Sequence, residues 1–151
     1  MERNFTSDTS NSSVANDSYL SFVLTTPAGD GTRVIVNPLK IWASGSLFET
    51  DFLSDVSSSG GTARASYSLD GAGISGCAIL AGATIVDGTV GQHYLFGDST
   101  NTGSYLECSA QEYFLTPGGK YAIRVTNKSG AVAPISISAT WREVTHPGLR
   151  F

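Results

Sequence analysis

The sequence predicts an all-β protein whose strands form an antiparallel sandwich or a barrel. Charged residues make up only 15% of the 151 residues, against about 25% in a typical globular domain. Glycine is frequent, with 17 residues. Short alternating apolar and polar stretches recur about every ten residues between Gly, Asp and Asn, a spacing typical of sandwiches and barrels. A single domain of this length buries enough surface to fold without disulfides.

The charge balance limits the partners that we expect. The net charge is −4 and the isoelectric point is about 4.9, so the chain lacks the cationic surface that neutralises phosphates. We therefore expect no nucleic acid and no membrane as a partner. The sequence has no apolar run of about 18 residues and begins with polar side chains, so we also expect neither a membrane span nor a signal peptide.

Residues 1–18 predict a flexible N-terminal arm. Phe5 and Val14 are the only sizeable apolar side chains in this segment, too few to offset the entropy lost when it is ordered alone. An extended arm of this length reaches on the order of 60 Å and could cross a neighbouring subunit. On this interpretation the arm could be deleted, and residues 19–144 would still fold as the β-sandwich body.

The body opens with two predicted strands. Residues 19–25 place Leu20, Phe22 and Leu24 on one face of an extended chain, the pattern of a half-buried strand. The β-branched and aromatic run that follows is interrupted by Pro38. Because proline cannot donate to a central ladder, it marks a bend or an edge of the sheet.

Residues 47–56 fit two structures. Phe48, Phe52 and Val56 also fall at helical spacing, so a short helical turn is an alternative to a strand here. The segments that follow are short and bounded by turn residues, and each predicts a further strand. These segments are residues 62–69, 76–80, 84–86, 92–96, 105–108 and 113–115.

The clearest alternation comes late in the chain. In residues 121–126 and again in residues 135–142, every second side chain is apolar. We interpret the two segments as a β-hairpin with one buried face and a loop longer than two residues. Residues 145–151 then form a short C-terminal tail, in which Leu149 and Phe151 lie outside the last strand.

Few side chains could support catalysis. His93 falls in a predicted strand and is more simply a packed or surface imidazole, and His146 lies in the tail without a rigid support. Nearby carboxylates such as Glu49 and Asp51 fit solvated charges better than an acid and base pair. We therefore expect a protein that is not an enzyme.

The two cysteines do not indicate a metal site. Cys77 and Cys108 are about thirty residues apart and lack the close Cys or His spacing of zinc ligands. Two small buried thiols are favoured over a disulfide. No phosphate-binding loop or calcium pattern occurs either, so we expect no metal and no cofactor.

Part of the sequence resembles a known family. Residues 114–130 read Phe-Leu-Thr-Pro-Gly-Gly-Lys-Tyr-Ala-Ile-Arg-Val-Thr-Asn-Lys-Ser-Gly, and residues 135–143 read Ile-Ser-Ile-Ser-Ala-Thr-Trp-Arg-Glu. Together they resemble the C-terminal hairpin of small virion proteins of tailed bacteriophages, the capsid cement or decoration proteins. Residues 22–29 and 45–49 are similar to the opening strands of that family. The resemblance implies an antiparallel, jelly-roll-like β-sandwich.

The resemblance also implies a function. The chain would be a non-enzymatic decoration protein that binds the shell of the major capsid protein and stabilises the head. It would lie on the surface of the virion after assembly in the host cytoplasm, and it would associate with itself as a homodimer or homotrimer. The alternative is a head-fibre or tail-associated adhesion module that binds a host-surface glycan through an exposed Trp42 or Tyr105.

A shell-binding protein of this kind needs contact residues rather than an active site. Its arm and its tail are the predicted interaction elements, because a segment that folds on a partner and repeats on a symmetric lattice gains from many weak contacts. The candidates for contact with the capsid or with another subunit are Arg3, Phe5, Leu149 and Phe151.

Overall fold

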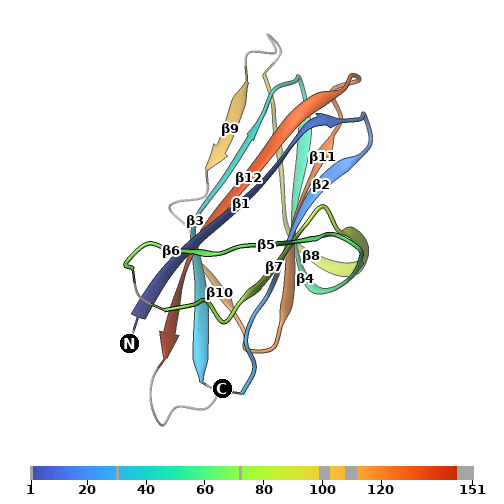
Figure 1. Ribbon diagram of the computed structural model, residues 1–151. Coiled ribbons are helices and arrows are strands. Elements are labelled where there is room, and N and C mark those ends of the chain that lie inside the picture. Colours follow the sequence, from blue (N-terminus) through green and yellow to red (C-terminus); the bar gives the residue numbers. More distant parts are fainter. Residues whose placement is uncertain (1, 30, 72, 99–102, 108–111, 146–151) are drawn as a thin grey trace.

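The computed structural model of the chain consists of two antiparallel β-sheets that face each other across an apolar interior (Figure 1). It describes all residues except 1, 30, 72, 99–102, 108–111 and 146–151. The described residues form twelve strands and no helix, which confirms the predicted antiparallel β-sandwich. This part of the chain therefore has no helix that is long and apolar enough to cross a membrane.

The strands differ greatly in length, from two residues to thirteen. They are β1 (Glu2–Val14), β2 (Tyr19–Thr25), β3 (Thr32–Ala43), β4 (Phe48–Ser59), β5 (Thr62–Arg64), β6 (Tyr67–Ser68), β7 (Ala78–Ala81), β8 (Thr84–Phe96), β9 (Ser104–Glu107), β10 (Tyr113–Leu115), β11 (Lys120–Asn127) and β12 (Ala133–Thr145). Sheet A has the order β10-β3-β12-β1-β6, and β9 also pairs with β3. Sheet B has the order β5-β7-β2-β11-β4-β8.

The longer strands pair in the manner of one rolled-up hairpin. Strand β1 pairs with β12, β2 with β11, β3 with β9 and β10, and β4 with β8. The outgoing strands β1 to β4 alternate between the two sheets, and the returning strands follow them. Rolling the hairpin adds two further pairings, β12 with β3 and β11 with β4. This nested connectivity is that of a jelly roll.

The predicted hairpin of residues 121–126 and 135–142 is wrong in its pairing. Both strands exist, but β11 lies in sheet B and β12 in sheet A, and residues 128–132 connect the two sheets. Alternation shows which face of a strand is buried. It does not show whether two successive strands pair within one sheet or face the same interior from opposite sheets. The pattern therefore predicted the two strands and could not identify their neighbours.

The prediction of a flexible arm in residues 1–18 is also wrong. Strand β1 pairs with β12 along most of its length, from Glu2 opposite Val144 to Val14 opposite Ala133. The body of the fold therefore begins at β1 and not at Tyr19. The physical reason is that β1 does not have to be ordered alone, because a strand from the far end of the chain supplies its hydrogen bonds.

The inward positions of β1 explain why its composition resembles that of a mobile arm. Phe5 is 1% exposed and stacks near Trp141, with ring centroids 6.2 Å apart. The next two inward side chains are Ser7 and Thr9, which are small, polar and buried. A count of large apolar residues therefore misses a strand that fills its inner face with small side chains.

Two ambiguous segments of the sequence are bent strands. Pro38 lies inside β3, where the register with β12 shifts between Ala139 and Trp141. The residue marks a bend in a central strand and not an edge. Residues 47–56 belong to β4 and form no helical turn, and Asp55 has a φ of 51° beside a register shift. Bulges of this kind increase the local twist and bend the strand.

The two open sides of the sandwich differ. On one side, β6 extends sheet A beyond β1 while β7 and β5 extend sheet B beyond β2, so this segment lies across the gap between the sheets (Figure 1). Ser7 Oγ on β1 donates to the Ala65 carbonyl between β5 and β6. The other side is bounded by the edge strands β10 and β8. One side of the sandwich is therefore sealed by an inserted segment.

Sheet B also carries a small apolar cluster on its outer face. Val23 and Ala122 lie there with Leu53, which pairs with Ala122, and with Val56 and Ala83. The bent ends of β4 and β8 supply the covering side chains. This cluster is separate from the main core, which lies between the sheets.

The first prediction concerns β1. Replacement of Phe5 by Ala removes a fully buried ring and leaves a cavity beside Trp141, which costs about 3–5 kcal/mol. We expect a large fall in the urea midpoint of unfolding with little change in slope. Ser10→Ala, an exposed position on the same strand, serves as the control. A Phe5→Ala protein as stable as the parent would show that β1 is not part of the core.

Candidate functional site

The four predicted contact residues do not form one site. Phe5 is buried in the core, so it cannot contact a capsid without unfolding β1. The Arg3 side chain is partly exposed, with its Nη2 atom 4.0 Å from Glu143 and its guanidinium over the ring of Phe5. Leu149 and Phe151 lie outside the described residues.

Three exposed apolar side chains lie on β6 and in the segment that follows it. We name Tyr67, Leu69 and Ile74 the β6 patch, because two of them lie on or beside β6, and Ile74, which is 87% exposed, lies in the loop that follows. Tyr67 pairs with Thr6 of β1, and the Leu69 amide donates to the Asn4 carbonyl. The patch therefore borders the first residues of β1.

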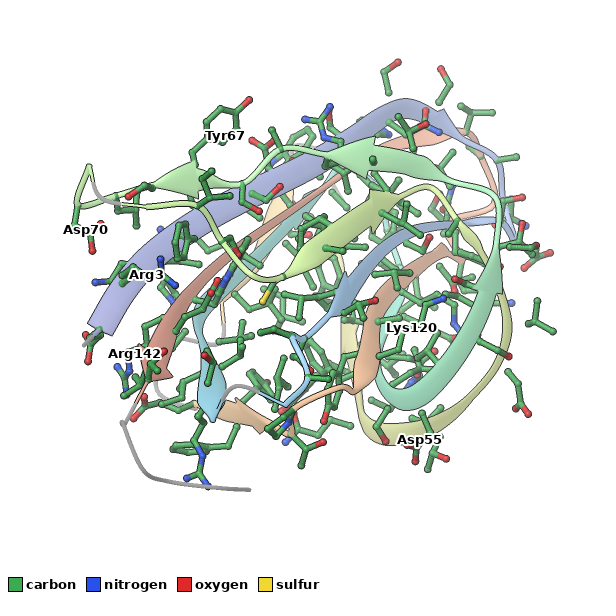
Figure 2. All side chains as sticks on the ribbon, turned by 60° about the horizontal axis from the view of Figure 1, so that its bottom comes forward. Arg3, Asp55, Tyr67, Asp70, Lys120 and Arg142 are labelled. Atoms are coloured by element: carbon green, nitrogen blue, oxygen red, sulfur yellow. The ribbon has the colours of Figure 1, made fainter. Side chains whose placement is uncertain are left out.

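Figure 2 shows how the patch is placed relative to the labelled charges. Tyr67, Asp70 and Arg3 lie on the same side of the molecule, away from Asp55 and Lys120 (Figure 2). A Cβ atom on Gly73 would lie 2.6 Å from Nη1 of Arg3, so the loop backbone runs directly against this guanidinium. The patch therefore combines apolar side chains with one cation and a nearby carboxylate.

A buried carboxylate anchors the loop that carries this patch. Glu143 is 1% exposed and lies on the inner face of β12. It accepts hydrogen bonds from the Ser75 hydroxyl, from the Gly76 amide at 2.9 Å and from the Trp141 indole at 3.0 Å. Three donors satisfy most of the acceptor capacity of a buried carboxylate. Ser75 and Gly76 are thereby fixed against sheet A.

Cys77 lies beside Glu143. Burial, together with the negative charge of Glu143, raises the pKa of the Cys77 thiol to about 12. The Cys77 side chain also contacts the main core, and this thiol is free. Cys77 is partly buried, so the prediction of a buried thiol is confirmed in part, while Cys108 lies outside the described residues.

A polar row crosses the outer face of sheet B. Pairing places Ser21, Arg124, Asp51 and His93 side by side on four neighbouring strands. His93 Nδ1 lies 2.6 Å from one oxygen of Asp51, and Arg124 donates to the other at 3.0 Å. Asp51 is therefore a bridging carboxylate rather than the solvated charge that we expected.

The same row brings an imidazole and a hydroxyl into one region of the sheet. A carboxylate that accepts from one ring nitrogen orients the other, as a general base requires. The nearest hydroxyl in the row, however, is Ser21, which is fully buried and donates to the Ala83 carbonyl. In this arrangement Ser21 holds the β7–β8 connection against the outer face of sheet B, which is a structural task.

An apolar groove of about 440 Å³ opens between the sheets on the side of β10 and β8. The groove opens along the edge of β3 that faces away from β12. Two short strands pair with this edge and leave a gap between them, because β10 pairs with β3 only as far as Val36 and β9 begins to pair with it at Lys40. Both sheets contribute to the lining. The apolar side chains that define it are Val36, Leu39, Leu115, Phe22, Phe52 and Ile123.

A second groove, of about 360 Å³, lies on sheet A and contains Trp42. Lys40 and Trp42 of β3 line it together with Ser136 and Ser138 of β12. The Trp42 side chain is half-buried, and its indole lies against Gly103, where a Cβ atom would be 2.9 Å from Nε1. An aromatic side chain flanked by hydroxyls and a charge is the chemistry that a sugar-binding surface uses.

The comparisons with known proteins add no identification. No known protein family matches the sequence, and no curated protein matches it either. Within the described ranges, no three His, Cys, Asp or Glu side chains come together in a way that could hold a metal ion.

The sequence analysis did not identify the buried Glu143 or the group of Asp51, His93 and Arg124. For Glu143 the sequence does contain a pattern that predicts its position. Glu143 continues the inward series of Ile135, Ile137, Ala139 and Trp141 at every second position, so the alternation itself placed this carboxylate inside. The triad of Asp51, His93 and Arg124 carried no comparable signal, because it depends on the pairing of three strands distant in the sequence.

The second prediction concerns the reactivity of Cys77. A pKa of about 12 in place of 9.0 lowers the thiolate fraction at pH 8 by about a thousandfold. In a Cys108→Ser background, we therefore expect Cys77 to react with an aromatic disulfide reagent far more slowly in the folded protein than in urea. Since the thiolate forms more readily in the unfolded chain, stability should fall as the pH rises from about 9 towards 12.

A matched variant separates burial from charge in this experiment. Glu143→Gln removes the charge near Cys77 while it keeps the size of the side chain, and we expect faster labelling of the thiol. Equal rates for the folded and unfolded parent protein would contradict the assigned environment of Cys77.

Proposed function

We propose that this chain is a non-enzymatic decoration protein of a tailed-bacteriophage head, which binds the shell of the major capsid protein and stabilises it. The resemblance of residues 114–143 suggests this role, and the jelly-roll connectivity is compatible with it, since jelly rolls recur in viral capsid proteins and in lectins. A fold serves many functions, so the argument depends on surfaces that could bind a shell.

The β6 patch is the observation that carries the proposal. Its three apolar side chains, Tyr67, Leu69 and Ile74, are all more than half exposed. A group of exposed apolar residues with a polar rim is typical of a protein interaction site. Arg3 and Asp70 lie on the same side of the molecule as Tyr67 (Figure 2), and Arg and Tyr are among the residues that contribute most to binding energy.

The contact residues proposed for the shell are therefore partly different from those expected. Arg3 remains, since the loop backbone at Gly73 lies against its guanidinium, and Phe5 is withdrawn because it is buried. Leu149 and Phe151 stay predictions. The arm is replaced as the interaction element by the loop between β6 and β7, which Glu143 holds in place.

Self-association, as a homodimer or a homotrimer, is part of the proposal and has its own support. Strand β8 ends the order of sheet B and runs for 13 residues. It exposes Val86, Val90 and Leu95 and carries Asp87 as its only Asp, Glu, Lys or Arg residue. A long edge strand with few charges is a template for pairing with another chain.

The third prediction tests shell binding. We expect the purified protein to co-sediment with expanded phage heads at a fixed ratio to the major capsid protein, and to raise the temperature at which the heads open. The triple variant Tyr67→Ser, Leu69→Ser and Ile74→Ser should bind at least about tenfold more weakly, because it removes the apolar contacts of the patch.

The matched control replaces an exposed apolar residue elsewhere. Val132→Ser changes a side chain that is similarly exposed, so it should leave both the fold and shell binding intact. Heads that resist heating equally well with and without the protein would argue against a stabilising role. Full binding by the triple variant would move the contact to another surface.

A second function is favoured by one observation, the groove that contains Trp42. Here the chain would be a head-fibre or tail-associated adhesion module that binds a host-surface glycan, with the sugar stacked on the indole and hydrogen-bonded to Ser136 and Ser138. The two serine hydroxyls and Lys40 give a sugar hydrogen-bonding partners in this groove, and the Trp42 indole gives it an apolar face.

The fourth prediction distinguishes the two functions. Under the glycan hypothesis, Trp42→Ala abolishes binding to immobilised host-cell glycans, whereas the triple variant of the β6 patch keeps it. Under the decoration hypothesis, the two variants have the opposite effects on head binding. Circular dichroism checks that Trp42→Ala remains folded, since this side chain is half-buried.

A further inference from the structure

The apolar groove between β10 and β8 is a slot that runs across the strands. On sheet B its lining comes from β2, β11, β4 and β8, and on sheet A it comes from β12, β3 and β10. Strands β2 and β8 are three strand spacings apart, so the slot extends about 14 Å from the edge of sheet B towards its middle. The groove is therefore elongated, and it opens to solvent at the edges of the two sheets.

The slot is also narrow. Phe52 of sheet B and Tyr113 of sheet A lie on its opposite walls, and their ring centroids are only 5.2 Å apart. A helix with its side chains is about 10–12 Å across, which is too thick for this gap. An extended peptide would bury its amide and carbonyl groups among apolar side chains, and each unsatisfied group costs free energy. The geometry therefore favours a small molecule that has no peptide backbone.

The size and the walls of the groove fit an alkyl chain. Its volume is about 440 Å³, within the range of roughly 300–1,000 Å³ that is typical of small-molecule sites. A cavity of about 150 Å³ lined by Leu, Ile and Phe holds a benzene ring, so this groove accepts a larger apolar molecule. A flexible chain can follow the elongated slot and leave its polar end in water. The apolar side chains that it would contact are Phe22, Val36, Leu39, Phe52, Leu115 and Ile123.

The charges at the groove limit the head group of such a molecule. Glu112 is the only charged residue among the described residues that line the groove, and its carboxylate is already bound by Arg142. An anionic head group would meet the Glu112 carboxylate, and a cationic one would compete with Arg142. An uncharged hydroxyl meets neither cost, and the side-chain amide of Gln92, which also lines the groove, can hydrogen-bond to it.

We propose that this groove binds the alkyl chain of an uncharged amphiphile, such as a long-chain alcohol, with the hydroxyl at the edge formed by β8 and β10. The proposal goes beyond the proposed function and does not rest on it. The β6 patch lies on the other open side of the sandwich, so shell binding and chain binding use different surfaces.

The test uses the full chain and the uncharged fluorescent probe N-phenyl-1-naphthylamine, which brightens in apolar surroundings. We expect saturable binding of one probe molecule per chain, and displacement of the probe by decanol. Hexanol should need at least about a tenfold higher concentration, because it buries fewer methylene groups. A parent protein that shows no saturable binding of the probe would overturn the proposal.

Two variants place the binding in the groove. Leu115→Glu introduces a charge into its wall and should weaken probe binding at least about tenfold. Ser54→Phe fills part of the groove without adding a charge and should weaken binding as well. Val132→Glu makes the same change as the first variant at an exposed apolar residue elsewhere, so it should bind like the parent. Circular dichroism and the urea midpoint check that each variant is folded.

The pattern of affinities decides between the possible outcomes. If both groove variants are folded and bind the probe as tightly as the parent, the probe binds elsewhere and the proposal is overturned. Decanoate should compete several-fold more weakly than decanol, because its carboxylate meets Glu112. Tighter binding of decanoate would overturn the assignment of an uncharged head group. Decanol should also raise the unfolding temperature of the parent and leave that of Leu115→Glu unchanged, since a ligand stabilises only the protein that binds it.

Discussion

The pairing of the first strand with the last is the interaction on which the rest of the structure depends. Strands β1 and β12 are hydrogen-bonded from Glu2 to Val14, although their residues lie more than a hundred positions apart in the sequence. Closing so large a loop costs entropy before any contact compensates for it. The compensation comes from burial, since Phe5 packs near Trp141 in the interior. Once this pair is fixed, the other pairs nest inside it.

One open side of the sandwich is covered and the other is not. The long connection between β4 and β8 covers the first side, whereas the short strands β9 and β10 leave the second side partly open. The connection between β4 and β8 contains β5, β6 and β7, and it closes the side next to β1 and β2. On the opposite side β9 and β10 are short, and the interior reaches the edge as the apolar groove. The connection that follows β4 and the one that precedes β8 also pack closely together, because a Cβ atom on Gly61 would lie 2.9 Å from that of Ala83.

Local patterns predicted most of the strands and few of their partners. The alternation of residues 19–25 and 121–126 identified the side chains that face the interior between the sheets. It did not predict that the outer face of β2 is covered as well, so that residues 20–24 are all buried. The neighbour of β12 could not be predicted, because it is a strand rich in Ser and Thr that lacks large apolar residues apart from Phe5 and Val14. Residues 47–56 were ambiguous since a bulge at Asp55 breaks the period-two pattern.

The same limit applies to the candidate sites. Composition can count Phe5, Leu149 and Phe151 as apolar residues near the ends of the chain, but exposure depends on pairing. Phe5 is buried only because β12 and β6 both pair with β1. The Asp51 triad likewise requires β4, β8 and β11 to be neighbours. Glu143 differs, since its inward position follows from the alternation within one strand.

Glu143 also links the framework of the fold to the surface proposed for binding. A carboxylate that is 1% exposed is costly to desolvate unless donors surround it, and here the donors include the Ser75 hydroxyl and the Gly76 amide of the loop. Loss of the loop contacts would leave that charge poorly satisfied, so the loop is held in one position. Ile74 precedes these anchors directly. A patch ordered in this way loses little conformational entropy when it binds, which favours the loop between β6 and β7 over a disordered terminus as the contact element.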